Sequence, residues 1–352
     1  MDEIADRVFQ LDDVSIAAGS SSTLQLFDES PSSLSLIIDI NPLQWFRLKD
    51  QIDLKDLSRS ICIYLNCHLS LNSSNKVNVL VANNFSDGEE NGGSKILFPS
   101  IHTKTDEHGS SFGNSQGKNL VNPNMYRQFR FVDEIFLEEL HSILQKEPTE
   151  LNIKNFKNTL SGALSISLSY INKLNLSNDG LLKSRILIIS VTDDDSLPYI
   201  STMNCIFAAQ KMKVPIDVLK LDKKDGVNNS IFLQQATDAT NGIFQKITHP
   251  KGLVQYLSTS FLIDSNLRSI LILPTNFKID FRSSCFLTKK IIDIGYVCSV
   301  CLCILSLIPK NHRCPVCDSK FDDKVIEKLL KKPVVGVSNT NGKKKRKINS
   351  VM

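Results

Sequence analysis

Two kinds of hydrophobic pattern alternate along the chain from residue 34 to residue 261. Short, nearly continuous apolar runs, such as Leu34-Ser-Leu-Ile-Ile-Asp-Ile40, are typical of strands buried on both faces of a parallel sheet. Longer segments with apolar residues at helical spacing, such as residues 54–71, predict amphipathic helices. The predicted strands are 34–40, 76–81, 185–191, 214–221 and 242–247, and the predicted helices are 54–71, 131–145, 156–174, 198–213, 230–239 and 251–261. This alternation predicts an α/β fold with a doubly wound, mainly parallel sheet and helices on both faces.

Composition divides the chain into four parts. Residues 1–30 are acidic and rich in serine, and we interpret them as an N-terminal arm. The α/β domain takes in residues 31–264 and contains a polar insertion, residues 82–124, in which only 96–98 and Ile101 could form a strand. Short extended segments expected at 268–273 and 277–281 belong to a small C-terminal module, residues 265–330. A basic, flexible tail, residues 331–352, follows.

The strongest chemical signal is a doubled Cys-x-x-Cys motif in the C-terminal module. Cys298-Ser-Val-Cys301 and Cys314-Pro-Val-Cys317 are separated by a loop of twelve residues. Four thiolates at this spacing suit a tetrahedral zinc ion, bound at about 2.3 Å from each sulfur. Four protein ligands leave no open position for water, so the motif predicts one structural zinc ion. Free buried thiols or a redox pair are the alternatives, and the doubling of the motif disfavours the redox pair.

Cysteine content and the start of the sequence indicate a reduced, soluble, intracellular chain. Nine cysteines among 352 residues is an odd number and an ordinary share, unlike the cysteine content of a disulfide scaffold. Met1 is followed by Asp2-Glu3-Ile4, so we expect no signal peptide, and no apolar stretch approaches the ~20 residues of a membrane span.

Residues 287–352 contain 14 Lys and Arg against 5 Asp and Glu, so the net charge of +4 leaves −5 on residues 1–286. Such an acidic body is a poor surface for nucleic acid.

Carboxylates follow two of the predicted strands. The first strand ends in Asp39, Asn41 and Pro42, where we expect a loop, and three consecutive carboxylates, 193–195, follow the strand at 185–191. Ligands bind at the carboxyl ends of parallel strands, so these groups could hold Mg²⁺. The von Willebrand A-type fold does so with an Asp-x-Ser-x-Ser loop, whereas this chain has Asp39-Ile-Asn41-Pro-Leu43, in which Leu43 cannot supply an oxygen. A Mg²⁺-dependent ligand-binding A-domain is therefore an alternative to solvated loop residues or helix caps.

Signatures of enzyme active sites are absent from the sequence. There is no G-x-x-x-x-G-K-[ST], G-x-G-x-x-G after a strand, G-x-S-x-G or H-E-x-x-H motif. The six histidines are scattered, and we expect exposed or capping roles for them. Cys285, Cys303 and His312 add to the possible zinc ligands of the module, but their spacings do not match a RING-type ubiquitin ligase, which is a further alternative. We expect Cys303 to act as a small buried hydrophobe.

Several sequence blocks follow one another in a specific order between about Leu34 and Asp322. The most specific are Ile38-Asp-Ile-Asn-Pro42, with Trp45 close behind, and Ile294-Gly-Tyr-Val-Cys-Ser-Val-Cys-Leu302. The others are Met203-Asn-Cys-Ile-Phe-Ala-Ala-Gln-Lys211, Leu233-Gln-Gln-Ala236 leading to Asn241-Gly242, Leu271-Ile-Leu-Pro274, and Asp280-Phe-Arg282 with Cys285-Phe286. In these blocks the chain resembles the smaller of the two zinc-binding, von Willebrand A-like core subunits of the general transcription and DNA repair factor TFIIH. The polar insertion, Cys303 and the basic tail depart from the family pattern.

The resemblance implies a non-catalytic structural subunit with a von Willebrand A-like domain and a single-zinc, ribbon-like or RING-like module. In this family the α/β domain binds the zinc-bearing C-terminal region of the larger von Willebrand A-like subunit, which contacts the repair helicase. The complex opens promoters for RNA polymerase II and unwinds DNA in nucleotide excision repair. Contact with nucleic acid would be indirect, and no membrane contact is expected. The cationic run Lys343-Lys-Lys-Arg-Lys347 is typical of a nuclear import signal, and a solvated tail is the alternative.

Overall fold

The computed structural model describes residues 30–83, 93–99, 126–145, 158–177, 182–193, 197–221, 230–247, 249–263, 267–274 and 279–330. Contacts divide the chain into two units, Met1–Arg282 and Ser283–Met352. The sequence-based boundary, between residues 264 and 265, was drawn earlier in the chain. The two boundaries differ because Arg268 pairs with Asp217, and Gln235 donates to the carbonyls of Asp280 and Arg282, so that residues beyond 264 contact the first unit. The predicted arm, most of the polar insertion and the basic tail lie outside the described residues.

The first unit is built on a six-stranded sheet with the order β3-β2-β1-β4-β5-β6. The strands are β1 (Ser32–Ile40), β2 (Lys76–Asn83), β3 (Ser94–Phe98), β4 (Lys183–Ser190), β5 (Ile216–Leu221) and β6 (Phe244–Ile247). All neighbouring strands run parallel except β2 and β3. The predicted doubly wound, mainly parallel sheet is confirmed, and β3 contains the strand considered at 96–98. The order reverses between β1 and β4, where ligands of such folds bind.

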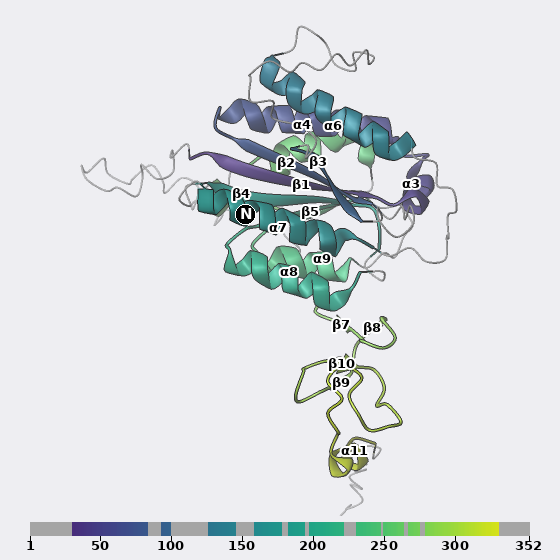
Figure 1. Cartoon of the computed structure of the whole chain (residues 1–352). Helices are drawn as coiled ribbons and strands as arrows, with labels where there is room; N and C mark the ends of the chain where they lie inside the picture. Colours follow the sequence, from purple (N-terminus) through teal and green to yellow (C-terminus); the bar gives the residue numbers. More distant parts are fainter. Residues whose placement is uncertain are drawn as a thin grey trace, which may run out of the picture. The chain divides into compact units, whose positions relative to one another are not determined.

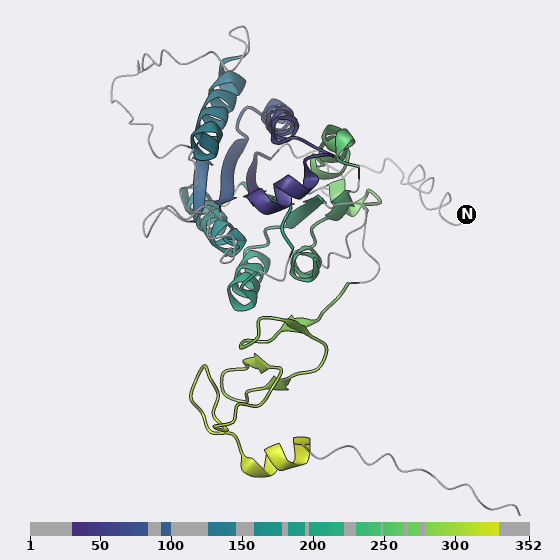
Figure 2. The ribbon, with the colours of Figure 1, turned by 90° about the vertical axis from the view of Figure 1, so that its right-hand side faces the viewer.

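Helices cover both faces of this sheet (Figure 1; Figure 2). The first face carries α4 (Leu54–Leu71), α6 (Arg127–Gln145) and α10 (Leu253–Tyr256), and the second carries α7 (Leu160–Ser177), α8 (Tyr199–Lys211) and α9 (Ile231–Ala239). Alternate β1 residues, Leu34, Leu36 and Ile38, are buried in the core beneath the first set. Among the described residues, no helix combines the length and apolarity needed to cross a bilayer.

Two local predictions are wrong. We expected a loop after β1, but helix α3 (Pro42–Leu48) begins there, with the fixed φ of Pro42 suited to its first turn. The indole Nε1–H of Trp45 donates to the carbonyl of Asp39 at 3.0 Å, which holds this helix against the end of β1. The segment expected to be extended from residue 268 instead begins within a 3₁₀ turn, Leu267–Ser269.

Gly242 is required where the chain returns from α9 to β6. The preceding Asn241 is left-handed, with φ of 55°, and the N–H of Gly242 donates to the carbonyl of Thr237 at 2.7 Å. A Cβ atom at position 242 would lie 1.8 Å from the carbonyl oxygen of Ile216. Only glycine allows this close approach of the two backbones.

The second unit has little regular structure. It contains β7 (Ser283–Ser284) paired with β8 (Ile291–Ile292), β9 (Tyr296–Val297) paired with β10 (Ile304–Leu305), and helix α11 (Asp323–Leu330). Its buried cluster consists of three cysteines and one leucine, namely Cys298, Cys303, Leu305 and Cys314. So small an apolar core needs additional stabilisation, which a bound metal commonly provides in modules of this size.

Candidate metal centre

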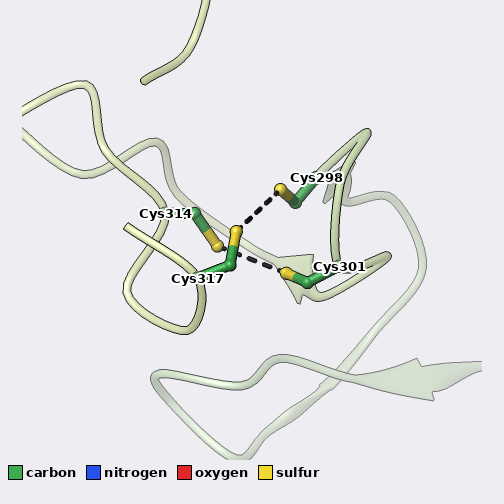
Figure 3. A group of neighbouring side chains, drawn as sticks. All are labelled: Cys298, Cys301, Cys314 and Cys317. Carbon is green, nitrogen blue, oxygen red and sulfur yellow. Dashed lines mark hydrogen bonds between the residues drawn. The ribbon is translucent and has the colours of Figure 1, made fainter. Parts of the chain in front are cut away.

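Four cysteine sulfurs come together in the second unit (Figure 3). Cys298, Cys301, Cys314 and Cys317 place their Sγ atoms within 4.8 Å of one another. Sγ of Cys298 lies 3.7 Å from that of Cys317, and Sγ of Cys301 lies 3.5 Å from that of Cys314. Metal–sulfur bonds of about 2.3 Å in a regular tetrahedron give sulfur–sulfur edges of about 3.8 Å. The cluster therefore has the size and the donor chemistry of a tetrahedral thiolate site and could hold one metal ion.

Two turns with the same backbone geometry present these sulfurs. In the turn Cys298–Cys303, the N–H of Cys298 donates to the carbonyl of Cys303 at 3.0 Å, and the N–H of Leu302 donates to that of Cys298 at 2.9 Å. The turn Cys314–Ser319 repeats both bonds, at 2.9 and 3.0 Å. The residue after the second cysteine is left-handed in each turn, with φ of 58° at Leu302 and 55° at Asp318. Each Cys-x-x-Cys pair is thus held with both sulfurs directed into one cluster.

Hydrogen-bond donors around the cluster shift the pKa values of its thiols. The pKa of Cys298 is lowered to about 6, chiefly by the backbone N–H of Cys301 and then by the hydroxyl of Ser319. The pKa of Cys317 is also lowered, first by the Ser319 hydroxyl, 3.0 Å away. A backbone hydrogen bond involving Cys303 lowers the pKa of Cys301, but burial and hydrogen bonds with neighbouring sulfurs outweigh it and raise that pKa to about 12. Donors that favour thiolates at Cys298 and Cys317 also favour metal binding, because a metal binds the thiolate form.

The other candidate ligands of the module lie outside this four-sulfur cluster. Cys303 is buried, as expected, and burial raises the pKa of its thiol to about 11. The Cys285 sulfur accepts hydrogen bonds from the backbone N–H and the hydroxyl of Ser306, both at 3.1 Å. Nδ1 of His312 lies 2.9 Å from the carboxylate of Asp323, near the surface. Within the described residues, no second group of three or more potential metal ligands is found.

Protein groups contact the two described carboxylates, Asp39 and Asp193, at the carboxyl edge of the sheet. Asp39 is 1% exposed and accepts the backbone N–H groups of Val191 and Thr192 at 3.1 and 2.8 Å. The ammonium group of Lys220, also 1% exposed, donates to the carbonyl of Thr192 and lies 3.8 Å from the carboxylate of Asp193. Burial raises the pKa of Asp39, while these hydrogen bonds and the charge of Lys220 oppose that rise. Lys220 therefore supplies positive charge at this edge. The other two carboxylates, at 194 and 195, lie outside the described residues.

Comparison with known proteins identifies the family. The family described as Transcription factor Tfb4 matches residues 31–318. The chain belongs to the Tfb4 family. It is 44% identical over 359 residues to "General transcription and DNA repair factor IIH subunit TFB4" of Eremothecium gossypii, with 99% of each chain covered. It is 39% identical over 344 residues to the Saccharomyces cerevisiae protein of the same name, with 95% of this chain and 96% of that one covered.

A solved structure agrees with the Tfb4 assignment and with the fold. "Crystal Structure of the TFIIH p34 N-terminal Domain" is 30% identical, has a TM-score of 0.52, and covers 66% of this chain and 98% of that one. The predicted resemblance and fold class are thus confirmed.

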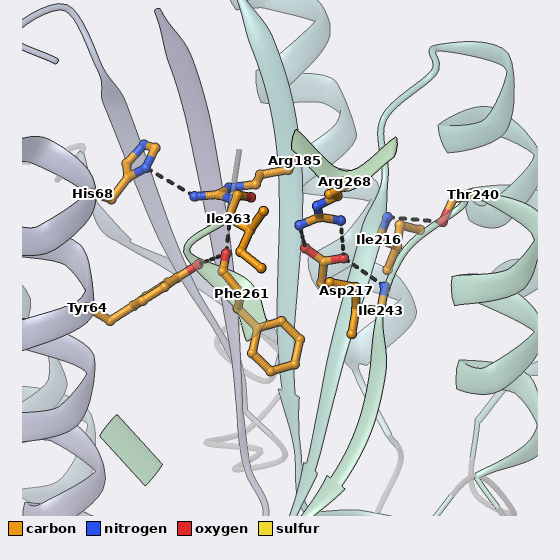
Figure 4. Close-up of polar contacts among 10 residues, drawn as sticks. All are labelled: Tyr64, His68, Arg185, Ile216, Asp217, Thr240, Ile243, Phe261, Ile263 and Arg268. Carbon is orange, nitrogen blue, oxygen red and sulfur yellow. Dashed lines mark hydrogen bonds and ion pairs between the residues drawn. The ribbon is translucent and has the colours of Figure 1, made fainter. Parts of the chain in front are cut away.

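A buried ion pair of this Tfb4-family chain was not predicted from its sequence (Figure 4). The guanidinium of Arg268 donates to both carboxylate oxygens of Asp217, at 2.7 and 2.5 Å, and the N–H of Ile243 donates to the same carboxylate at 2.9 Å. Asp217 is 1% exposed. A charged residue inside the apolar run 216–221 was the signal available, because a buried carboxylate requires a partner. The partner, 51 residues further along the chain, could not be identified from spacing.

A second buried network joins β4, α4 and the segment after α10 (Figure 4). Arg185 donates to the carbonyls of Phe261 and Ile263 at 2.9 and 2.8 Å, and its guanidinium lies 3.3 Å from Nδ1 of His68. The hydroxyl of Tyr64 donates to the Phe261 carbonyl at 3.0 Å. The expectation of an exposed or capping role is wrong for His68, which is fully buried. Burial, and then the charge of Arg185, lowers the pKa of His68 to about 3.

Proposed function

We propose that this Tfb4-family chain is a non-catalytic structural subunit of the general transcription and DNA repair factor IIH, acting in RNA polymerase II transcription initiation and nucleotide excision repair. The observation that carries the proposal is the family match over residues 31–318, together with relatives of the same IIH subunit name that align along nearly the whole chain.

Two features of the described residues support a non-catalytic role. Four protein sulfurs would complete the tetrahedral shell of a bound metal ion, so the cluster of Cys298, Cys301, Cys314 and Cys317 would leave no position for a substrate or a reactive water. At the edge of the sheet, Asp39 is engaged by backbone N–H groups next to the buried ammonium group of Lys220. At the position where von Willebrand A-type domains bind Mg²⁺, Asp39 is thus already hydrogen-bonded within the protein.

The metal of the C-terminal module is proposed to be one zinc ion per chain. Thiolate donors in a tetrahedron favour zinc among the common divalent metals, and zinc does not add redox chemistry to the site. In the proposed organisation, a von Willebrand A-like domain, residues 31–264, is followed by the zinc module, residues 265–330. The four cysteines act as architecture, since Cys298 and Cys314 belong to the buried cluster of the module and Cys301 and Cys317 pack against it.

The proposed direct partner is the larger zinc-binding, von Willebrand A-like subunit of the same complex, with the helicases among the other subunits. A broad sheet covered by helices on both faces offers rigid docking surfaces, and we expect the interface to bury well over ~1,000 Å². The site of action is the nucleus, and contact with nucleic acid is indirect, in keeping with the net charge of −5 on residues 1–286, which follows from +4 for the chain and +9 for the remainder.

Affinity purification of the tagged full chain from its own cells tests this proposal. We expect the IIH core subunits, helicases included, to co-purify with the chain. Recovery should be unchanged in EDTA and in the Asp39→Ala variant. Loss of the partner in both would favour a Mg²⁺-dependent A-domain, and reproducible ubiquitin-chain formation with a panel of conjugating enzymes would favour a ligase. Recovery of the chain alone would contradict the proposal.

A further inference from the structure

The C-terminal module contains a third turn with the backbone geometry of the two metal-binding turns. In Cys285–Lys290, the N–H of Cys285 donates to the carbonyl of Lys290 at 2.9 Å, and the N–H of Lys289 donates to that of Cys285 at 2.8 Å. Lys289 is left-handed, with φ of 54°. Both bonds and the left-handed residue occupy the same positions in the turns that begin at Cys298 and Cys314.

The third turn differs from the other two at its second ligand position. Thr288 stands where Cys301 and Cys317 stand in the metal-binding turns. The Cys285 sulfur, which is fully buried, accepts hydrogen bonds from the backbone N–H and the hydroxyl of Ser306, both at 3.1 Å. Burial raises the pKa of Cys285, but the hydrogen-bonding groups of Ser306 and Thr288 outweigh it and lower that pKa to about 6. A hydroxyl and an amide donor thus contact this sulfur, as a metal ion would contact the sulfurs of the other two turns.

The two clusters of the module interleave along the chain. The four-sulfur cluster is formed by the turns 298–303 and 314–319, and Ser306 lies between these turns in the sequence. A second cluster is formed by Cys285 and Ser306, and the turn 298–303 lies between these two residues in the sequence. A bond from the N–H of Phe286 to the carbonyl of Ile304, at 2.9 Å, supports the same crossing.

This crossing matches the plan of cross-braced modules that bind two zinc ions. In that plan four ligand pairs follow one another, the first and third pairs bind one ion, and the second and fourth pairs bind the other. The corresponding pairs here are 285 and 288, 298 and 301, 306 and 309, and 314 and 317, each separated by two residues. The second and fourth pairs are all cysteine, whereas the first and third read Cys285, Thr288, Ser306 and Pro309.

We propose that the module is a two-site, cross-braced fold in which only the four-sulfur site binds metal, and hydrogen bonds from Ser306 to Cys285 replace the metal of the other site. The proposal rests on the zinc assignment made under the proposed function. It explains why Cys285 is buried without belonging to the four-sulfur cluster. In this fold the other ligand positions of the first site are residues 288, 306 and 309. Cys303 and His312 therefore do not stand at ligand positions.

Metal analysis of purified full-length variants tests this proposal. Thr288→Cys, Ser306→Cys and Pro309→Cys together complete the first site, and the triple variant should bind about two zinc ions per chain where the wild type binds about one. The control is Leu287→Cys, Leu307→Cys and Lys310→Cys, which adds the same number of cysteines at exposed neighbouring positions. This control should stay at about one ion.

A second variant keeps the proposal testable if the triple variant does not fold. Cys285→Ala should retain the single zinc ion and lower the unfolding temperature, because hydrogen bonds are lost and no ligand is removed. Loss of zinc from Cys285→Ala would overturn the proposal, as would a folded triple variant with the metal content of its control. A wild-type chain without metal would overturn the zinc assignment as well, so the two failures can be told apart.

Discussion

The buried ion pair between Arg268 and Asp217 gives the sharpest prediction for the stability of the first unit. Both carboxylate oxygens of Asp217 accept a hydrogen bond from Arg268. The side chains of Arg268 and Asp217 are 8% and 1% exposed, respectively. The variant Arg268→Ala leaves this carboxylate in the protein interior with the N–H of Ile243, 2.9 Å away, but without its counter-ion. An uncompensated buried charge is costly because water cannot solvate it.

The expected loss follows from the burial of the pair. Breaking a buried, hydrogen-bonded pair by removing one partner costs about 3–5 kcal/mol, a large part of the ~5–15 kcal/mol that stabilises a typical domain. For a unit of this size, each kcal/mol lowers the unfolding temperature by roughly 2–4 °C, so the variant should unfold about 6–20 °C lower. The double variant Arg268→Ala with Asp217→Asn should be more stable than Arg268→Ala alone, since the amide is neutral and still accepts from Ile243.

Urea and thermal unfolding followed by circular dichroism measure these differences. The matched control is Arg59→Ala, which removes an arginine from Asp56 in a pair whose side chains are 77% and 61% exposed. Exposed pairs contribute about 0–1 kcal/mol, so the control should unfold nearly as the wild type does. A loss for Arg268→Ala as small as that of the control, or a double variant less stable than Arg268→Ala, would refute the reasoning.

Four further predictions concern other parts of the chain. Cys298→Ser should abolish metal binding and expose residues 283–330 to limited proteolysis while the α/β domain resists, because thiolate–zinc binding contributes on the order of 10–16 kcal/mol in small zinc-finger peptides; equal resistance of both parts would contradict this. Gly242→Ala should lower stability by about 1–3 kcal/mol in urea, because its Cβ would collide with backbone; an unchanged midpoint would count against that contact. The pKa of His68 is about 3 when folded and about 6.5 when unfolded, so the unfolded state binds the extra proton and stability falls as the pH drops from 6.5 toward 3. His68→Gln should reduce the slope of stability against pH by up to about 1.4 kcal/mol per pH unit in that window, and equal slopes would show that His68 does not titrate as described. Finally, adding Mg²⁺ should not raise the unfolding temperature of the wild type, because Lys220 and backbone donors already engage the groups at the sheet edge; a concentration-dependent rise would reveal a cation site there.

The sequence predicted the α/β architecture because its strands are buried on both faces and read as nearly continuous apolar runs. The boundaries of α4 agree with the prediction at both ends, since helical spacing of apolar residues begins at Leu54 and ends at Leu71. Helix α3 was missed because its seven residues span about two turns, too few for a periodic pattern to stand out, and because Asn41-Pro42 is also typical of a turn. Local signals therefore predicted the long elements and failed for the short one.

The proximity of the two sulfurs within each Cys-x-x-Cys pair is a local property, because both cysteines of a pair lie on one turn. The partners of Asp217, Arg185 and Cys285 could not be predicted from the sequence, because each depends on how distant segments pack. Arg185 meets the carbonyl of Phe261, 76 residues further along the chain, and Cys285 meets Ser306, 21 residues away. For both Arg185 and Cys285, the sequence shows the residue itself but does not indicate its partner.

Native mass spectrometry of the complex purified through the tagged chain tests the central claim most directly. It reports at once which subunits accompany the chain, how many copies of the chain are present, and how much metal each copy carries. We predict one copy of the chain together with the IIH core subunits, and a mass increment of about one zinc ion that disappears in Cys298→Ser. A homo-oligomer of the chain without other subunits, or an assembled complex in which the chain carries no zinc, would contradict the account.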